Sequence, residues 1–341
     1  MKYVVREIAD REQWEAYVRQ FSPNSFLQSW DFGQFHQSLG DRPLYLGLFE
    51  GNSQAGGGLF VLTYARRGNY YACAAGPLVR EGTSYAEAVT LFVDYLKTRA
   101  HQDRASFIRI RPALLNTPDN EKRFRDFGFL PSVMHLHAER TWVLDLSLTE
   151  EEILAAMRKN TRYYVKRAPK DGVSVSMCFD RDAVEILYRL QQETVSRQHF
   201  VPFTHDYFMG LFEAFKANNE VALFTATFET QPIASAMVNY YGDSAVYHYA
   251  ASANEFSKLP GAYAILWAAI KEAKLRGCRY FNFWGVVGDD QEKHPWYGLS
   301  RFKKGFGGQE IWYLHAQDLP LSWRYHVNRA IETVRKWKRG L

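Results

Sequence analysis

A segment near the end of the chain combines cations, aromatic rings and glycines, which is typical of a loop that lines a pocket. The string WYGLSRFKKGFGG places Arg301, Lys303 and Lys304 beside glycines that allow close backbone approach. Cations that point into a pocket attract negatively charged groups. Phe302 and Phe306 flank the two lysines and would anchor the segment inward, which argues against a solvated turn. We therefore expect an anion-stabilising site here, in a loop between two strands.

A second cationic segment lies in the middle of the chain. Residues 158–170 hold six basic side chains and no acidic one. Thr149 followed by three glutamates predicts a helix start with a capping box, so we expect one basic helix over 150–168. Two interpretations stay open: a solvated face that compensates the helix dipole, or a surface for a polyanion. The cations are Arg158, Lys159, Arg162, Lys166, Arg167 and Lys170.

The C-terminal residues repeat the basic theme. Residues 321–341 hold six basic and one acidic side chain, and apolar residues from Trp323 to Trp337 recur at helical spacing. We expect a basic amphipathic helix over 321–341. Its apolar stripe could dock on the protein itself, lie on an anionic membrane or hold RNA. The two cationic segments together carry +11, so the remaining chain carries −6 and the basicity belongs to two patches.

Composition limits the class of protein. The chain has 341 residues, of which 47% are hydrophobic and 23% charged, so it can bury a large core and is not disordered. No apolar run reaches the ~18 residues that cross a bilayer, and the first residues carry charges, so we expect a cytoplasmic protein, with contact to the inner membrane face left open. Cys73, Cys178 and Cys278 are far apart, so we expect buried thiols, no disulfide and no metal site.

The hydrophobic periodicity predicts the same order of elements in both halves. The first half reads as a helix at 11–21, strands at 44–50, 57–64 and 70–77, a helix at 85–99 and a strand at 106–111. The second half reads as a helix at 183–197, strands at 221–229, 233–241 and 244–251, a helix at 262–276 and a strand at 280–284. We therefore expect an α+β fold with mixed sheets and flanking helices, divided into domains at 1–145 and 146–320 with the helix at 321–341 added.

This order resembles the GNAT acyltransferase fold present twice. Enzymes of that fold that use coenzyme A carry a Q/RxxGxG/A loop, which holds the pyrophosphate at a helix N-terminus. The best candidate, Lys258 to Tyr263, departs from the pattern at its first and last positions, and nothing comparable precedes Tyr85. We therefore expect no coenzyme A and no other cofactor.

Four strings together resemble the Fem family of peptidoglycan-bridge aminoacyltransferases (FemA, FemB and FemX). They are SFLQSWDFGQFHQSLG, MRKNTRYYVKRA, HYAAS and HPWYGLSRFKKGFGG. The resemblance spans nearly the whole chain and implies transfer of an amino acid from aminoacyl-tRNA to the stem peptide of UDP-MurNAc-pentapeptide or lipid II. The coiled-coil arm of FemA-type members has no counterpart here, so the chain is similar to the compact FemX type, and we expect a monomer.

The resemblance also implies roles for single residues. Phe302 and Lys303 match the pair to which catalysis is attributed, and Arg197 matches an arginine that contacts the precursor phosphate. Gln28 and Trp30 fall on a Lys-x-Trp substrate-binding pair whose lysine is replaced here. Further substrate contacts are expected from Tyr249, Arg301 and Lys304, and tRNA contacts from Arg158, Lys159, Arg162, Lys166 and Arg167. Where some members carry an acid, this chain has Val79 and Arg80, so no acid is expected to be essential there.

The mechanism expected on these grounds is aminolysis of an activated ester, with Lys303 stabilising the oxyanion. His36, His248 and His294 are expected to be structural, and we identify no general base. Two other classes stay open: an N-acyltransferase that uses coenzyme A, and a tRNA-binding module without catalysis. Transfer to a lipid or to a protein N-terminus is a further alternative on the same scaffold.

Overall fold

The computed structural model describes residues 2–198 and 202–339, with side chains placed at 2–194 and 202–337, and divides the chain into two units. Unit 1 comprises Met1–Glu139 and Trp312–Leu341, and unit 2 comprises Arg140–Ile311. The boundaries predicted at 145 and 320 therefore need correction. Strand pairing gives the reason: the strand at 140–145 belongs to the sheet of unit 2, and the strand at 317–320 joins that of unit 1.

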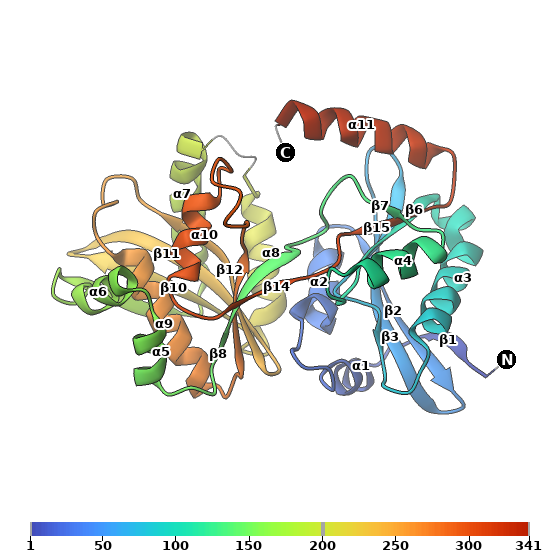
Figure 1. Cartoon of the computed structure of the whole chain (residues 1–341), viewed down its shortest axis with the longest axis horizontal. Helices are drawn as coiled ribbons and strands as arrows, with labels where there is room; N and C mark the ends of the chain where they lie inside the picture. Colours follow the sequence, from blue (N-terminus) through green and yellow to red (C-terminus); the bar gives the residue numbers. More distant parts are fainter. Residues whose placement is uncertain (1, 199–201, 340–341) are drawn as a thin grey trace. The chain divides into compact units, whose positions relative to one another are not determined.

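Unit 1 is built on one mixed sheet (Figure 1). In spatial order its strands are β1 (Val4–Glu7), β2 (Arg42–Glu50), β3 (Ser53–Thr63), β4 (Asn69–Ala74), β6 (Ala105–Arg111), β15 (Gln317–Pro320) and β7 (Leu130–Pro131), with β5 (Leu78–Val79) paired to β3. Its helices are α1 (Arg11–Val18), η1 (Phe26–Gln28), α2 (Trp30–Ser38), α3 (Tyr85–Asp103), α4 (Pro118–Asp126) and α11 (Arg324–Arg339). Alternate residues of β2, β3 and β6 pack with the apolar face of α3 in one buried core.

Unit 2 is built on a second mixed sheet. In spatial order its strands are β14 (Gln309–Trp312), β8 (Arg140–Asp145), β13 (Tyr280–Gly285), β12 (Ser244–Ser252), β11 (Gln231–Tyr241), β10 (Val221–Phe228) and β9 (Val173–Cys178). Its helices are α5 (Glu150–Ala156), α6 (Lys159–Arg167), α7 (Arg181–Gln198), α8 (His205–Lys216), α9 (Gly261–Leu275) and α10 (Tyr297–Lys304). Side chains of α5, α6 and α9 form one apolar core with the strands, and α7 also packs on β10, β11 and β12.

The predicted repeat is confirmed, with one difference between the copies. The order β2-β3-β4-α3-β6 in unit 1 corresponds to β10-β11-β12-α9-β13 in unit 2, and each copy ends in a parallel pair. In unit 1, β4 and β6 stay paired from Asn69 to Ala74. In unit 2, β12 and β13 pair only at 244–246 with 280–282, so the rest of β12 is not joined to β13. The second copy therefore has an open end where the first is closed.

The basic segment forms two helices where one was predicted. Thr149 and Glu152 form the predicted capping box at the start of α5. The chain then turns extended at Met157, and the backbone N–H of Arg158 donates to the carbonyl of Gly305 at 2.9 Å. Because the N–H of Arg158 bonds to Gly305 and not to a carbonyl of α5, helix α5 ends there and a second helix, α6, begins. Among the helices of the described residues, none has both the length and the apolar composition to cross a bilayer.

A buried carboxylate joins distant segments of unit 1. Glu139 Oε2 accepts from His135 Nδ1 at 2.7 Å and from His315 Nδ1 at 2.8 Å, while Glu139 Oε1 accepts from the backbone N–H of Ala316. Burial favours the neutral acid, but the two imidazoles outweigh it and hold the pKa of Glu139 at about 2. Burial likewise disfavours the imidazolium of His315, but Glu139 raises its pKa. The cluster ties residue 315 to residues 135–139.

Glu139→Gln should lower the free energy of unfolding by about 1–3 kcal/mol near pH 6, because the amide NH2 cannot accept from the imidazoles. The depressed pKa of Glu139 means that its contribution is full above about pH 4.5 and is lost towards pH 2. The raised pKa of His315 means that its contribution is present below about pH 6.5 and is lost as the pH rises further. Urea unfolding at pH 3, 6 and 9 should give the largest difference at pH 6. The exposed Glu81→Gln is the control, and a difference that is the same at all three pH values would contradict this account.

Candidate active site

Lys303 is the most unusual charged group of unit 2. It is 6% exposed, and its ammonium donates one hydrogen bond, to the carbonyl of Gly285 at 2.8 Å. No carboxylate lies within ion-pair distance of it among the residues whose side chains are placed. Burial lowers the pKa of Lys303 to about 7, because the ammonium loses its water. Two of its three N–H donors are left for a ligand, which is what an oxyanion contact requires.

The segment that carries Lys303 is a helix, where a loop was expected. α10 begins after Trp296 and ends at Gly305, and Ser300 Oγ accepts from the backbone N–H of Val287 at 2.9 Å. A Cβ at Gly305 would collide with Thr161 Oγ1 of α6, and Gly308 has a φ of +97° against the carbonyl of Val143. The glycines therefore allow close packing and a turn after the helix, which supports the prediction of close backbone approach.

Strand β13 ends in an irregular backbone beside Lys303. Its register with β8 shifts between Asn282 and Gly285, and Trp284 between them has a φ of +67°. A non-glycine residue in this region carries strain of about 1–3 kcal/mol. The Trp284 ring lies 5.0 Å from that of His248 on β12. The Gly285 carbonyl at the end of this bulge thus accepts from Lys303, and the Trp284 ring lies against the part of β12 that is not paired with β13.

His248 is neutral at this position. It hydrogen-bonds Asn239 Oδ1 through Nδ1 at 3.1 Å, and burial lowers its pKa to about 3. A base with so low a pKa takes no proton from an amine near pH 7. This agrees with the structural role expected for His248.

Phe302 needs a corrected account. Its ring packs edge-on against Tyr263 of α9 and against Phe306, with centroids 4.8 and 5.6 Å apart. Phe302 in α10 and Phe306 just after the helix therefore both pack on the core of unit 2. These contacts favour a role for Phe302 in positioning the helix.

The other two cations of the segment differ from each other. Lys304 is buried and its ammonium pairs with Asp289 Oδ1 at 2.7 Å, 5.3 Å from the centre of the Trp142 ring. The hydrogen bond from Lys304 lowers the pKa of Asp289. Arg301 is exposed on the surface of α10. Arg301 is therefore open to an anionic substrate, whereas Lys304 already has a carboxylate partner.

Tyr249 lies in an aromatic cluster on the part of β12 that pairs with β11 but not with β13. Its hydroxyl is 2.9 Å from that of Tyr207, and the rings of Phe203 and Phe208 stand edge-on to it. Burial raises the pKa of Tyr249 well above its usual value, so it is a neutral hydrogen-bonding group. The predicted substrate contact would therefore be uncharged.

Two of the five cations predicted to contact tRNA, Arg162 and Arg167, already have partners within the protein. Arg162 donates to the carbonyl of Ala155 at 2.9 Å and so caps the end of α5. Arg167 pairs with Asp171, one residue beyond the acid-free segment, and with the Tyr163 hydroxyl. Arg158, Lys159 and Lys166 are exposed, and none of them has an ion pair among the placed side chains. These three cations form the α6 patch.

In unit 1, Gln28 has a structural role. Its side chain is fully buried: Nε2 donates to the Ala74 carbonyl at 2.6 Å, and Oε1 accepts from the backbone N–H of Leu59 at 2.8 Å. No atom of it is exposed to a substrate, which corrects the expectation of a direct contact. Trp30 is half-buried and stacks on Tyr45 with the ring centres 4.0 Å apart.

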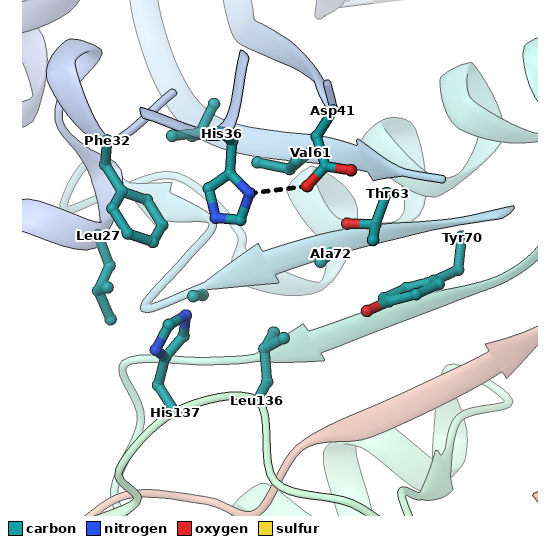
Figure 2. Close-up of a pocket in the computed structure, with 12 residues that line it drawn as sticks. Leu27, Phe32, His36, Asp41, Val61, Thr63, Tyr70, Ala72, Leu136 and His137 are labelled. Carbon is teal, nitrogen blue, oxygen red and sulfur yellow. Dashed lines mark hydrogen bonds and ion pairs between the residues drawn. The ribbon is translucent and has the colours of Figure 1, made fainter. Parts of the chain in front are cut away.

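A cavity of about 110 Å³ opens in unit 1 beside these residues (Figure 2). Apolar side chains from Leu27 and Phe32 line it, and His36 hydrogen-bonds Asp41 Oδ2 at 2.9 Å on its wall. His137 faces the cavity from the other side. No local sequence motif marks this cavity, because its residues come from four separate segments of the chain.

The remaining predictions concern Arg197, cysteines and metals. Arg197 belongs to α7, but its side chain lies outside the described residues. Cys73 and Cys278 are buried as predicted, Cys178 is half-buried, and all three are free.

Among the placed side chains, one group of possible metal ligands has its ligand atoms within 4.8 Å of one another: His135, Glu139 and His315. They hydrogen-bond to one another, and the string HLHAE at 135–139 is the sequence signal for this group.

This chain is similar to known proteins of one family. The FemAB family model matches residues 134–231 and 224–332, together more than half of the chain. Aminoacyltransferase FemA of Staphylococcus epidermidis is 29% identical over 92 residues, or 27% of this chain, and the match spans only 22% of that protein's length. Lipid II:glycine glycyltransferase of Staphylococcus epidermidis is 19% identical over 291 residues, covering 65% of this chain and 70% of the relative.

Two solved structures identify the fold. The crystal structure of FemX superposes with a TM-score of 0.83 at 17% identity, covering 97% of this chain and 100% of FemX. A tandem GNAT protein from the clavulanic acid biosynthesis pathway gives a TM-score of 0.60 at 10% identity, covering 94% of this chain and 99% of that protein. The predicted α+β fold of two GNAT-like units is thereby confirmed. With the family model matched over most of unit 2, this chain belongs to the FemAB family.

Proposed function

We propose that this protein transfers an amino acid from aminoacyl-tRNA to an amine on the stem peptide of a peptidoglycan precursor, either UDP-MurNAc-pentapeptide or lipid II. The observation that carries the proposal is the buried Lys303 ammonium, which has two unfilled donors and no carboxylate partner among the placed side chains. Membership of the FemAB family and the names of its relatives, aminoacyltransferase and lipid II:glycine glycyltransferase, support it.

The reaction needs alignment and charge stabilisation more than acid–base catalysis. The neutral amine attacks the ester carbonyl, a C–N bond forms and the C–O bond to the tRNA ribose breaks. The amine proton passes to the leaving ribose oxygen through water or the substrate. In the tetrahedral intermediate the carbonyl oxygen carries negative charge, and Lys303 donates to it. Phe302 holds α10 in place for that contact.

The substrates would bind through different groups. The cations of the α6 patch suit the phosphates of a tRNA acceptor stem. The backbone hydrogen bond from Arg158 N–H to the Gly305 carbonyl fixes this patch against the end of α10. Trp30, Tyr249, Arg197 and Arg301 are proposed for the precursor, with Lys304 holding the segment through Asp289. A lipid-linked precursor would further require peripheral contact with the inner membrane face.

The central test is transfer of a radiolabelled amino acid from charged tRNA to UDP-MurNAc-pentapeptide, with mass spectrometry of the product. A shift by one amino-acid residue is the expected result. Binding of tRNA without transfer would instead support a non-catalytic RNA-binding module. Titration with acetyl-coenzyme A addresses the other alternative, and a saturable heat of binding there would favour a coenzyme A-dependent enzyme. In the host, cell-wall peptides made without this protein should lack one bridge residue.

Lys303→Ala should lower kcat by about 10²- to 10³-fold, because one oxyanion donor contributes ~2.7–4 kcal/mol to the barrier. Precursor affinity should stay nearly unchanged, as measured by isothermal titration. Lys293→Ala removes an exposed lysine ten residues earlier and is the matched control. Turnover equal to that of the wild type in Lys303→Ala would discard the assignment.

Lys303→Met should raise stability while it abolishes the oxyanion contact. Below about pH 7 the folded protein holds a desolvated ammonium, and this cost disappears as the pH rises towards the unfolded value of 10.5. The variant should therefore be more stable than the wild type by about 1–3 kcal/mol at pH 6, with a smaller gain at pH 9.5. Urea unfolding at both pH values measures this. A variant less stable than the wild type at pH 6 would mean that the ammonium is not desolvated.

Charge reversal in the α6 patch should weaken tRNA binding. The double variant Lys159→Glu, Lys166→Glu should lower the affinity for tRNA at least 10-fold. It should also reduce the magnitude of the slope of log K against log[salt] by about two, since two phosphate contacts are lost. The control pair, Lys216→Glu with Lys258→Glu, makes the same charge change on exposed lysines elsewhere in unit 2. If both pairs weaken binding equally, the patch has no specific role.

A further inference from the structure

The C-terminal helix α11 docks on unit 1 through its polar face. Tyr325 and Asn328 are buried, and Arg329 Nη1 donates to the carbonyl of Pro131 at 2.8 Å. Glu332 Oε2 accepts from Arg109 Nη2 at 3.0 Å, and Arg109 also pairs with Asp318 of β15. These polar contacts fix the helix on the sheet. The C-terminal helix predicted over 321–341 is present as α11 (Arg324–Arg339), but its apolar stripe does not provide the docking surface.

The apolar stripe lies on the opposite side of the helix. Trp323 just before α11 is 72% exposed, Val327 50%, Val334 51% and Trp337 80%, and Ala330 is also exposed. At about 100° per residue these positions fall within roughly 80° of arc, half a turn from Tyr325 and Glu332. We call these five residues the α11 stripe. A helix that packs on its own protein normally turns such residues inward, so this arrangement indicates an apolar partner outside the unit.

The charges beside the stripe identify the kind of partner. Arg324 and Arg335 border it on one side and His326 on the other, and all three are exposed. Among the placed side chains of α11, Glu332 is the one acid, and it faces the docked side. Tryptophan side chains at both ends of an apolar stripe, with arginines at its edge, match the boundary between headgroups and acyl chains of an anionic bilayer. An amphipathic helix of this kind would lie on such a surface without spanning it.

We propose that the α11 stripe is a peripheral membrane-binding surface for anionic phospholipid. The proposal extends the proposed function by naming the surface that would hold the protein beside a lipid-linked acceptor, but the two can be tested apart. Trp323 and Trp337 would enter the interface while Arg324 and Arg335 meet lipid phosphates. Binding would be reversible, because a single helix face buries little area.

The test is co-sedimentation of the full chain with vesicles of phosphatidylcholine and phosphatidylglycerol at 3:1, and with vesicles of phosphatidylcholine alone. The wild type should bind the mixed vesicles at least 10-fold more strongly than the neutral ones. Trp323→Ser with Trp337→Ser should lower the partition coefficient on mixed vesicles at least 10-fold. The control, Leu115→Ser with Leu275→Ser, removes exposed apolar side chains elsewhere and should bind like the wild type.

Four results would overturn the proposal. The first three are absence of wild-type binding to the mixed vesicles, equal binding by the tryptophan variant, and a dimer in light scattering that the tryptophan variant converts to a monomer. The third would assign the stripe to a second copy of the chain. Transfer to the soluble UDP-MurNAc-pentapeptide separates this question from the proposed function, because the tryptophan variant should retain it in full. Loss of tRNA affinity in that variant, with vesicle binding intact, would assign the stripe to RNA and likewise overturn the proposal.

Discussion

The burial of one ammonium group without a counter-ion is the constraint on which the rest of unit 2 depends. Lys303 is held by the Gly285 carbonyl alone among the described groups, so its position needs β13 to end there and α10 to lie across that end. Gly305 and Gly308 allow this packing, and Phe302 fixes the helix on the core. Burying a charge in this way works against folding, which is the usual sign of a group kept for chemistry.

The two copies of the repeat differ in how far their parallel strand pair stays joined. In both, an antiparallel hairpin leads through a helix to a parallel partner strand. The pair β4/β6 remains closed, and the space beside it is filled by Gln28, whose amide bonds to the backbones of β3 and of Ala74. The pair β12/β13 separates after three residues, so Tyr249 on β12 and Trp284 on β13 lie beyond the part where these two strands are joined. An open parallel pair, not the fold itself, makes unit 2 the catalytic candidate.

The sequence predicted those features that local periodicity encodes. Strands such as β11 and the helices α3 and α9 follow from apolar spacing within single segments. α10 was missed because glycines at 298, 305, 307 and 308 suggested a loop, although only the last three lie outside it. Gln28 and Lys304 were predicted to contact substrate for another reason. The sequence does not show that Gln28 hydrogen-bonds to Ala74 or that Lys304 pairs with Asp289. Such partners are 15 to 46 residues away, beyond any local pattern.

The two cationic surfaces of the chain, the α6 patch and the α11 stripe, differ in the exposed apolar area that lies beside their cations. The α6 patch has lysines and an arginine with little exposed apolar area beyond Tyr163, so its interactions should depend almost wholly on counterion release and fall steeply with salt. The α11 stripe adds two exposed indoles to its arginines, so part of its binding energy comes from apolar burial, which salt does not screen. At moderate ionic strength the first surface would exchange its partner readily while the second stayed bound. That difference would suit the proposed function, in which a spent tRNA leaves after each turnover while the protein stays close to its acceptor.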